Sequence, residues 1–584
     1  MVKRIIVIIV VAIAFASCRN TYSSDTSLLG VSLPDEIPGF YMIMYNGTDY
    51  CIDIPKGSQE DGIELTLWKK NRGANQVWNI EEENGYVRFI SYNKKVLVLK
   101  HDPVTDELKV VQTERDDDSD MQLWKIEKTG NTYNIYSKYN GNVLTANSTL
   151  IGYKLKVKAE ADENRWSLIS LGNELFTPKQ MKEDVDYFLK TIENTHPNMY
   201  AYASKEAVKE RVDELLKELD KPLPYKDFYA KVAQLNSLFD GHTQIFYHNG
   251  LNYRHLIDYY YAKGGSFFPR DVSYESDKIY YIDSLNKKAR IISINGIPAE
   301  KICSTLNKVV SSEKEKTNAL YINRLFPLYL YAFLDIQGPV FNTVLEENQE
   351  INEQGKTLNQ LVRLHHPYYD RDEMYSMRVV EDTIALIEYN TCPMGADVDD
   401  FKQFIDSSFL VIKDKKIKHV FVDITRNGGG GGDEVNIFLY NKFNHKAHFW
   451  QSVKYVRRPG TEKIDTIKVL QCKDYIENQY AHNAYIIQSP LTYSAAVGVS
   501  AWFKFSKRAV IIGEETGGTT AAYVYTPTFT FPNSQIQFRV SNTLWTFPFG
   551  ARLDQGILPD IPAEINFDRP HFEANDLRRF LNHP

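Results

Sequence analysis

A tryptophan-centred motif occurs three times in the N-terminal third of this 584-residue chain. The copies Gln76-Val77-Trp78 and Gln122-Leu123-Trp124 lie about 45 residues apart, and Asn164-Arg165-Trp166 is a weaker third copy. Repetition at a fixed spacing constrains the fold, because each copy must form one unit that buries its apolar face against its neighbours. Short alternating runs such as Val87-Arg88-Phe89-Ile90 predict strands between the copies. The segment therefore predicts an all-β domain of three units.

The three copies resemble the QxW repeats of ricin-type β-trefoil lectins, and the resemblance spans residues 37–171. In that family each tryptophan packs in a shared core around a pseudo-threefold axis. We therefore expect a β-trefoil lectin domain over this range.

Only the first repeat holds the groups that a sugar site needs, which are carboxylate or amide groups for the hydroxyls and an aromatic face for the ring. The resemblance implies four ligands, namely Asp53, Trp68, Asn75 and Gln76. The second repeat has apolar residues, Val96 to Leu99, where the acid should be, and the third lacks both acid and aromatic residue. The alternative is a trefoil that serves as a spacer or protein-docking module, and Trp68 argues against it.

The N-terminus predicts export. Lys3 and Arg4 precede an apolar run, Ile5 to Phe15, which is too short to span a bilayer. The run ends at Cys18 in a sequence that resembles a bacterial lipobox, which implies a signal peptide over 1–18 and a diacylated Cys18. Residues 19–36 are polar and predict a flexible tether. We expect a lipid anchor in the cell envelope of a bacterium, on the outer membrane or periplasmic face; an ordinary signal peptide is the alternative.

Charge and cysteine content exclude several classes. The net charge of -7 gives no electrostatic support for a nucleic-acid partner. The cysteines beyond Cys18 are far apart and lack metal-ligand spacing, so we expect buried thiols and no metal; they are Cys51, Cys303, Cys392 and Cys472.

Residues 174–250 predict a helical region, since apolar residues recur at helical spacing after Thr177. A further helix leads into Asp240-Gly241-His242-Thr243, a tight turn that presents an imidazole. This turn resembles the DGHT element of the peptidase family that includes C-terminal-processing proteases and the tricorn core. A lone histidine is more often structural, so the motif needs partners elsewhere in the chain.

Two further elements supply those partners. Val420 to Ile424 predicts a buried strand that runs into five glycines, Gly428 to Gly432. The run lacks the GK[ST] of a P-loop, which disfavours phosphate binding. A second strand, Ala484 to Ile487, is followed by Ser494 at the start of a small-residue helix. A helix-capping serine is the alternative for Ser494.

These elements resemble the DLRxNxGG and TxSAA motifs of the same peptidase family, although Thr425 replaces the usual arginine. The resemblance implies that Ser494 is the nucleophile. It also implies that backbone amides of Ala495 and of Gly429 or Gly430 hold the oxyanion.

The general base follows by exclusion. The C-terminal-processing branch uses a lysine after its Gly-Glu-x-Thr element, but Thr519 stands there and no lysine occurs after Lys507. A serine needs a base within hydrogen-bond reach, so His242 becomes the expected base, as in the tricorn-like branch. A carboxylate should orient this imidazole. The family's acidic residue lies shortly before a Gly-x-x-Pro-Asp element, here Gly556 to Asp560, so the resemblance implies Asp554, the nearest acid, with Glu514 and Glu515 as alternatives.

Residues 251–365 contain Ala289 to Ala299, which resembles the strand and turn of a PDZ-like domain; a generic Asn-Gly hairpin would leave a similar trace. An α/β peptidase core is expected over 375–584.

We therefore expect a lipid-anchored serine endopeptidase that hydrolyses peptides or proteins through an acyl-enzyme, binds glycans through its trefoil and needs no cofactor. The alternative is a non-catalytic glycan-binding lipoprotein with a degenerate core. A glycoside hydrolase would need two flanking carboxylates, and no pair stands out.

Overall fold

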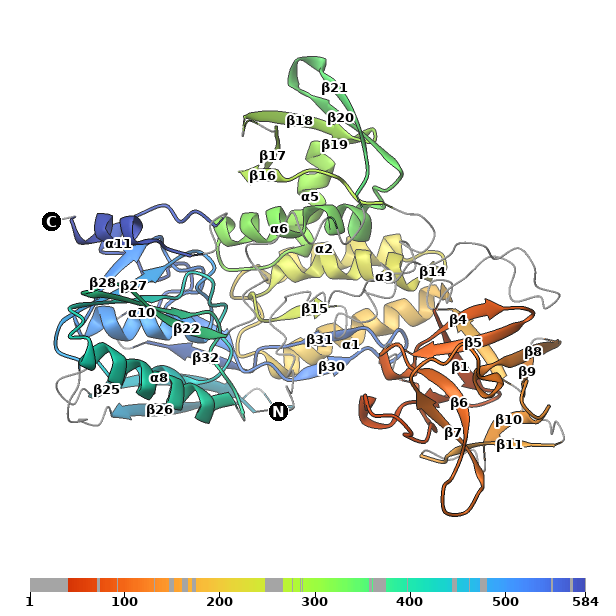
Figure 1. Cartoon of the computed structure of the whole chain (residues 1–584). Coiled ribbons are helices and arrows are strands. Elements are labelled where there is room, and N and C mark those ends of the chain that lie inside the picture. The colour runs from red at the N-terminus through yellow and green to blue at the C-terminus, as the bar shows by residue number, and fades with distance from the viewer. Residues whose placement is uncertain are drawn as a thin grey trace.

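The computed structural model shows an N-terminal β domain, a helical region, an insert of strands and helices, and a C-terminal α/β core (Figure 1). The insert lies at the top of Figure 1, the β domain at the lower right and the core at the left. The structure describes residues 40–582 except 71–73, 92, 131, 147–151, 160–165, 171–174, 247–265, 276, 284, 286, 357–359, 361–373, 396, 444–448, 459, 462, 473–479, 548–549 and 568–570. Three residues named in the sequence analysis, Cys18, Asn164 and Arg165, therefore lie outside the described residues. Among these residues no helix is both long and apolar enough to cross a membrane.

The N-terminal domain is built from antiparallel strands with three short 3-10 turns, η1 (Pro55–Gly57), η2 (Ala74–Gln76) and η3 (Asp120–Gln122). Its strands are β1 (Phe40–Tyr45), β2 (Tyr50–Asp53), β3 (Thr66–Lys69), β4 (Trp78–Glu83), β5 (Tyr86–Ser91), β6 (Val96–His101), β7 (Leu108–Thr113), β8 (Trp124–Thr129), β9 (Thr132–Ser137), β10 (Val143–Ala146), β11 (Leu155–Lys158) and β12 (Trp166–Ser170).

The repeated tryptophans hold this domain together in the same way three times. Trp78, Trp124 and Trp166 are each fully buried in one apolar cluster. Each indole N–H donates to a backbone carbonyl of its own repeat, at Ile52 (3.3 Å), Leu97 (3.1 Å) and Leu144 (2.9 Å). The bond satisfies the polar atom of each ring, so the rings can fill a dry centre. This threefold pattern confirms the predicted trefoil fold.

The helical region comprises β13 (Leu175–Phe176), α1 (Pro178–Thr195), α2 (Lys205–Glu218), β14 (Leu223–Pro224), α3 (Tyr225–Val232) and η4 (Ala233–Leu238). Thr177 and Gln180 form a capping box that starts α1, and Pro178 occupies its first turn. The apolar spacing places Val185, Phe188 and Ile192 in a shared core. From η4 the chain turns through residues 239–243 into β15 (Gln244–Phe246), so this region delivers His242.

The insert is an antiparallel sheet with α5 (Ala299–Val309) and α6 (Glu315–Leu334) beside it. Asn295 and Gly296 both have positive φ (46° and 76°), as a tight hairpin between β18 and β19 requires. The Asn-Gly signal is therefore a true hairpin, and the PDZ-like assignment stays a prediction. The strands are β16 (Val272–Glu275), β17 (Lys278–Ile282), β18 (Lys288–Ile294), β19 (Ile297–Pro298), β20 (Val340–Leu345) and β21 (Glu350–Gln354), with η6 (Glu346–Asn348) between the last two.

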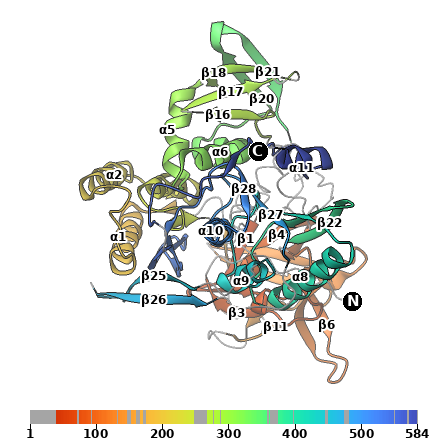
Figure 2. The same cartoon turned by 90° about the vertical axis from the view of Figure 1, so that its left-hand side faces the viewer.

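The core is a six-stranded sheet in the order β22-β23-β24-β27-β28-β33, and its last four pairings are parallel. The strands are β22 (Tyr375–Glu381), β23 (Ile384–Tyr389), β24 (His419–Asp423), β27 (Asn483–Gln488), β28 (Val510–Gly513) and β33 (Ile561–Pro562). Apolar side chains alternate between both faces. Helices α8 (Asp397–Asp414), α9 (Asp433–Asn441) and α10 (Ala495–Phe505) cover one face and α11 (Ala574–Leu581) the other, as Figure 2 shows. The structure thus confirms an α/β core.

Two smaller sheets complete the C-terminal part. One runs β26-β25-β32-β29, and the other pairs β15 with β31 and β31 with β30. The second sheet matters for function, because it joins the segment after His242 to a strand of the C-terminal region. The strands are β25 (Phe449–Arg457), β26 (Ile464–Cys472), β29 (Ala521–Val524), β30 (Thr528–Thr530), β31 (Gln537–Arg539) and β32 (Thr543–Thr546).

Candidate active site

Two loops meet at one edge of the core sheet. The glycine run follows β24, Ser494 follows β27, and the two strands are parallel neighbours. The carboxyl ends of parallel strands lie at the same edge, which is where ligand sites form in open α/β sheets. The glycine run and Ser494 follow neighbouring strands of the sheet, so they lie close together in space.

Ser494 occupies a sharp turn directly before α10. Its φ of 53° and ψ of -127° are unusual for a residue with a side chain. Two glycines let the neighbouring backbone pass close to it: a Cβ on Gly429 would lie 2.7 Å from Ser494 Cβ, and one on Gly518 would lie 3.1 Å from Ser494 N. Such strained turns concentrate at functional sites, where the surrounding structure holds them.

Asn427 holds the glycine loop in shape. Its side chain accepts the Gly429 N–H (2.9 Å) and donates to the Tyr389 carbonyl (3.0 Å), and it is fully buried. Gly431 N–H donates to the Cys392 carbonyl at 2.7 Å. Of the two glycine amides expected at the oxyanion, that of Gly429 is thus already engaged. The amides of Gly430 and Ala495 have no partner in the part of the chain that the structure describes.

Thr425 stands where the resembling family has arginine, and it forms a different local contact. Its hydroxyl and its N–H both bond to Asp423 Oδ1, at 2.7 and 2.9 Å. Its carbonyl accepts a hydrogen bond from the Ser489 hydroxyl. With threonine at this position, the start of the glycine loop is therefore held by hydrogen bonds to Asp423 and from Ser489.

His242 reaches Ser494 from the helical region. Its Nε2 lies 3.0 Å from Ser494 Oγ, although 252 positions separate them in sequence. Hydrogen-bond reach is the geometry that a general base needs. The imidazole also stacks on Tyr493, with ring centroids 5.0 Å apart and planes at 26°. The structure thus brings together the two residues that the sequence predicts to be nucleophile and base, from two distant segments of the chain.

Asp240 fixes the loop that carries His242. One of its carboxylate oxygens accepts the N–H groups of His242 (2.9 Å) and Thr243 (3.1 Å) and the hydroxyl of Ser541 (2.9 Å). The other lies 3.0 Å from Nε2 of buried His196, whose Nδ1 accepts the Asn198 N–H. Burial raises the pKa of Asp240, but the hydrogen bonds that its carboxylate accepts, first of all from His196, outweigh this effect and hold the pKa at about 2.

The environment of His242 favours the neutral imidazole. Burial lowers its pKa to about 4; Asp240 opposes this shift, and the nearby charge of Arg539 adds to it. A neutral imidazole can accept a proton through Nε2 while its hydrogen sits on Nδ1. Nδ1 has no hydrogen-bond partner among the described residues.

The acids expected to orient His242 lie elsewhere, and this corrects the sequence-based assignment. Asp554 is exposed and pairs with Arg552 at 2.7 Å. Glu514 contacts Lys316 and accepts the Ile565 N–H, while Glu515 contacts Lys314 and accepts the Gly556 N–H. All three carboxylates are engaged by other groups: the two glutamates contact lysines at the start of α6, and Asp554 pairs with its near neighbour Arg552.

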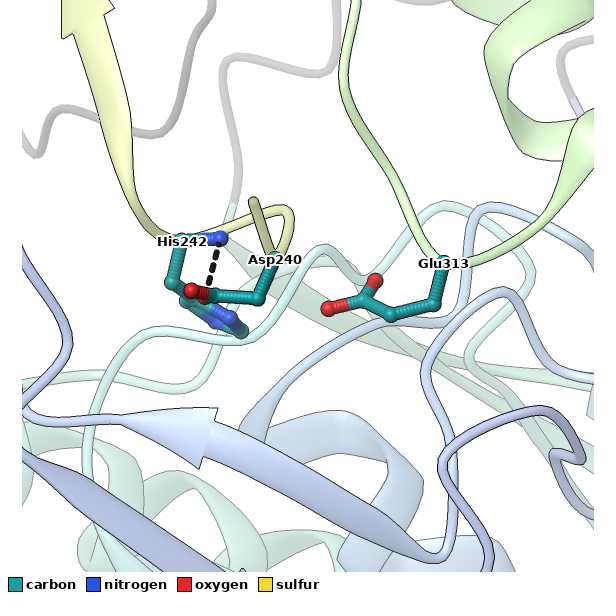
Figure 3. A group of neighbouring side chains, drawn as sticks. All are labelled: Asp240, His242 and Glu313. Carbon is teal, nitrogen blue, oxygen red and sulfur yellow. Dashed lines mark hydrogen bonds between the residues drawn. The ribbon is translucent and has the colours of Figure 1, made fainter. Parts of the chain in front are cut away.

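The carboxylates that do lie beside the imidazole are Asp240 and Glu313. One ligand atom from each of Asp240, His242 and Glu313 lies within 4.8 Å of the other two, and Figure 3 shows the Glu313 carboxylate pointing toward the other two side chains. Three such groups can share a cation in principle. Here Glu313 accepts hydrogen bonds from Gly241 N–H and the Tyr493 hydroxyl, so a cation would have to displace internal partners. The arrangement fits a hydrogen-bond network better than a metal centre.

Lysines near the core have other partners. Lys504 lies 2.7 Å from Asp560, and Lys314 bonds to Glu515 and to the Asp554 carbonyl. The group within hydrogen-bond reach of Ser494 Oγ is the imidazole.

The expected sugar ligands of the trefoil also lie together. Asp53 Oδ2 accepts the side-chain N–H groups of Asn75 (2.8 Å) and Gln76 (3.0 Å). Burial raises the pKa of Asp53 to about 6, against the lowering effect of these amides. Trp68 lies on β3, paired with Cys51 of β2, and 44% of its surface is exposed.

The other two repeats lack this set. The tryptophan-to-carbonyl bonds align Ile52 with Leu97 and Leu144, so Val98 and Thr145 occupy the position of Asp53. Strand pairing likewise puts Thr113 and Lys158 at the position of Trp68. Neither repeat presents an acid or an aromatic ring there.

Family models agree with both halves of this description. Residues 383–563 match the model of peptidase family S41, and residues 39–166 match that of the ricin-type beta-trefoil lectin domain. The chain carries a serine peptidase domain of family S41 behind a ricin-type lectin domain. No curated protein matches the chain.

Solved structures resemble the S41 and lectin regions at low identity. Mature CPAF in complex with lactacystin is 11% identical, with 69% of this chain and 95% of that chain covered and a TM-score of 0.45. The photosystem II D1 C-terminal processing protease is 12% identical, with 66% and 93% covered and a TM-score of 0.37. The designed threefold protein ThreeFoil is 22% identical over 23% of this chain and 99% of that chain, with a TM-score of 0.21. Likenesses at this level say nothing about substrate.

Four residues of the S41 site have no role predicted from the sequence: His196, Asp240, Glu313 and Tyr493. Tyr493 stands beside Ser494, and Asp240 stands in the DGHT turn, so position in a motif was a usable signal for both. His196 and Glu313 lie in segments with no motif, and only tertiary contacts reveal them.

Proposed function

We propose that the S41 domain hydrolyses peptide bonds through an acyl-enzyme on Ser494. His242 accepts the Ser494 proton and later donates it to the leaving amine. The amides of Ala495 and Gly430 hold the oxyanion beside the N-terminal end of α10, whose partial positive charge favours it. The 3.0 Å contact between His242 and Ser494 is the observation that carries the proposal.

A fluorophosphonate probe tests this proposal without knowledge of the natural substrate, because it reacts with serines that a base has activated. We expect labelling of Ser494, identified by mass spectrometry, together with cleavage of unfolded casein. A purified, folded protein that neither reacts with the probe nor cleaves casein would favour the alternative of a degenerate core. Since casein is unfolded and long, internal fragments would also show that cleavage is endoproteolytic.

The pH dependence of labelling should follow the lowered pKa of His242. Only the neutral imidazole accepts a proton, so labelling should be lost as pH falls through about 4. An unshifted histidine would lose activity near pH 6.5. We therefore expect measurable labelling at pH 5, and complete loss by pH 5 in a protein that remains folded would contradict the assignment.

We also propose that the first trefoil repeat binds a glycan. The Asp53 carboxylate, with Asn75 and Gln76 bonded to it, accepts hydrogen bonds from vicinal hydroxyls, and the exposed Trp68 face packs on the sugar ring. The single intact set supports one site in the domain rather than three.

Trp68→Ala should abolish glycan binding, while Trp78→Ala should unfold the domain. Trp68 is exposed, so its loss costs binding, by about 2 kcal/mol or more for an aromatic anchor. Trp78 is fully buried, and a buried tryptophan truncated to alanine costs about 3–5 kcal/mol of stability. A glycan array and thermal melting of the full chain separate the two effects. A wild-type protein without any glycan ligand would favour the spacer role.

We propose, finally, that Cys18 is lipidated and anchors the protein to the cell envelope. The lipobox-like sequence before Cys18 supports this proposal. Cys18→Ser should release the protein from the membrane fraction while fluorophosphonate labelling stays unchanged, because a lost acyl chain removes about 0.8 kcal/mol of anchoring per CH₂. Retention of the variant in the membrane fraction would argue against the anchor.

A further inference from the structure

Glu313 joins the two loops of the peptidase site. It lies on the connector between α5 and α6, outside both loops. One carboxylate oxygen accepts the Gly241 N–H at 3.1 Å, and the other accepts the hydroxyl of Tyr493. Gly241 directly precedes the general base, and Tyr493 directly precedes the nucleophile. One side chain thus bridges the neighbours of both reacting groups.

Tyr493 carries this link to the imidazole itself. Its ring stacks on His242 at a centroid distance of 5.0 Å, and the tyrosine is buried. A ring held at its hydroxyl end by Glu313 cannot slide along the imidazole face. Since Nδ1 of His242 has no partner among the described residues, this stacking replaces the hydrogen bond that usually fixes the orientation of a catalytic histidine.

Gly241 packs so closely against Tyr493 and Glu313 that only glycine fits at position 241. A Cβ there would lie 2.3 Å from the Tyr493 hydroxyl and 3.0 Å from Glu313 Oε2. The connector is also tied to the histidine loop beside this point, because the Ser311 hydroxyl donates to the Phe239 carbonyl at 3.1 Å. The three segments therefore form one packed unit.

We propose that Glu313 and Tyr493 are positioning residues that hold His242 against Ser494. The inference rests on the proposed catalytic role of the Ser494–His242 pair and adds residues that do not touch the reacting atoms. Glu313 holds the hydroxyl of Tyr493 by a hydrogen bond, and the Tyr493 ring orients the imidazole by stacking on it. The hydrogen bond from Gly241 N–H connects Glu313 to the loop that carries His242.

The ionisation of Glu313 should make peptidase activity depend on pH. Burial raises the pKa of Glu313 to about 7; the hydrogen bond from Tyr493 opposes this shift, and the charge of Asp240 adds to it. Above this pH the carboxylate is ionised, and its charge near the ring favours the imidazolium that forms as Ser494 attacks. Activity should therefore show a partial rise through pH 7, above and separate from the rise near pH 4 that the pKa of His242 predicts. The titratable and charged groups around the unit are Asp240, His242, Tyr202, Tyr321, Tyr493 and Arg539.

The experiment compares Glu313→Gln and Tyr493→Phe with Glu315→Gln, an exposed acid at the start of the adjoining helix. The first two variants keep the size and shape of the side chain: Glu313→Gln removes the charge and one of the two acceptor oxygens, and Tyr493→Phe removes the hydroxyl that Glu313 holds. We expect kcat on casein and the rate of fluorophosphonate labelling to fall about 100-fold in both, since a misplaced catalytic group costs about that much, with KM changed little. We also expect the rise through pH 7 to disappear in Glu313→Gln. Glu315→Gln should match the wild type.

Thermal melting separates positioning from folding. If Glu313→Gln has a lowered melting temperature, Tyr493→Phe still tests the positioning role, because it removes one oxygen and keeps the stacked ring. Wild-type labelling rates and an unchanged pH profile in a folded variant would overturn the inference. A wild-type protein that the probe does not label would overturn the proposed function instead, so the two failures are distinguishable.

Discussion

Ser494→Ala and His242→Ala should each abolish peptidase activity, and the double variant should be no worse than either single one. The two side chains lie 3.0 Å apart and act as a unit, so removal of one leaves the other without a function. We expect a loss in kcat of about 10⁴- to 10⁶-fold for each variant, as in other serine hydrolases with a single base. Casein cleavage and fluorophosphonate labelling measure it.

Two controls lie outside the site. His482→Ala removes an exposed imidazole, and Ser506→Ala removes a hydroxyl at the opposite end of the helix that Ser494 begins. Both should retain wild-type rates. Full activity in His242→Ala would contradict the serine-histidine pair and would direct the search for a base to His482 or to a lysine.

Gly429→Ala should inactivate the enzyme while the neighbouring Gly432→Ala does not. Gly429 has φ of +99°, and an added Cβ would lie 2.7 Å from Ser494 Cβ and 2.9 Å from the Tyr493 carbonyl. The methyl group must push the nucleophile turn away from His242, and we expect a loss of about 100-fold or more in kcat. Gly432 has nothing within 4 Å of its Cβ position and a negative φ of -73°.

The comparison tests the packing of the loop rather than its flexibility, because both variants lose one glycine. Thermal melting should show a moderate decrease for Gly429→Ala, since left-handed backbone and overlap both cost stability. Equal labelling rates in the two variants would mean that the glycine loop and Ser494 can move apart without consequence. That outcome would contradict the proposed oxyanion site.

The outline of the fold could be predicted from local patterns. The spacing of Trp78, Trp124 and Trp166 encodes a threefold core, because each ring fills the same position in its own repeat. The buried strands before the glycines and before Ser494 were also readable, since both are continuous apolar runs. Strand bounds shifted by about one residue, as expected where strand ends are set by neighbouring chains.

The sequence by itself determined the nucleophile turn, the glycine loop and the histidine turn, because each is a local backbone shape that needs particular residues: glycines at close approaches and a serine before a helix. Only the tertiary structure decided which carboxylates face His242. Asp554 lies near a motif but pairs with Arg552, whereas Glu313 lies in a segment without a motif and reaches the site. Contacts between distant segments depend on how β15 pairs with β31 and how the connector before α6 packs, and no local pattern encodes that arrangement.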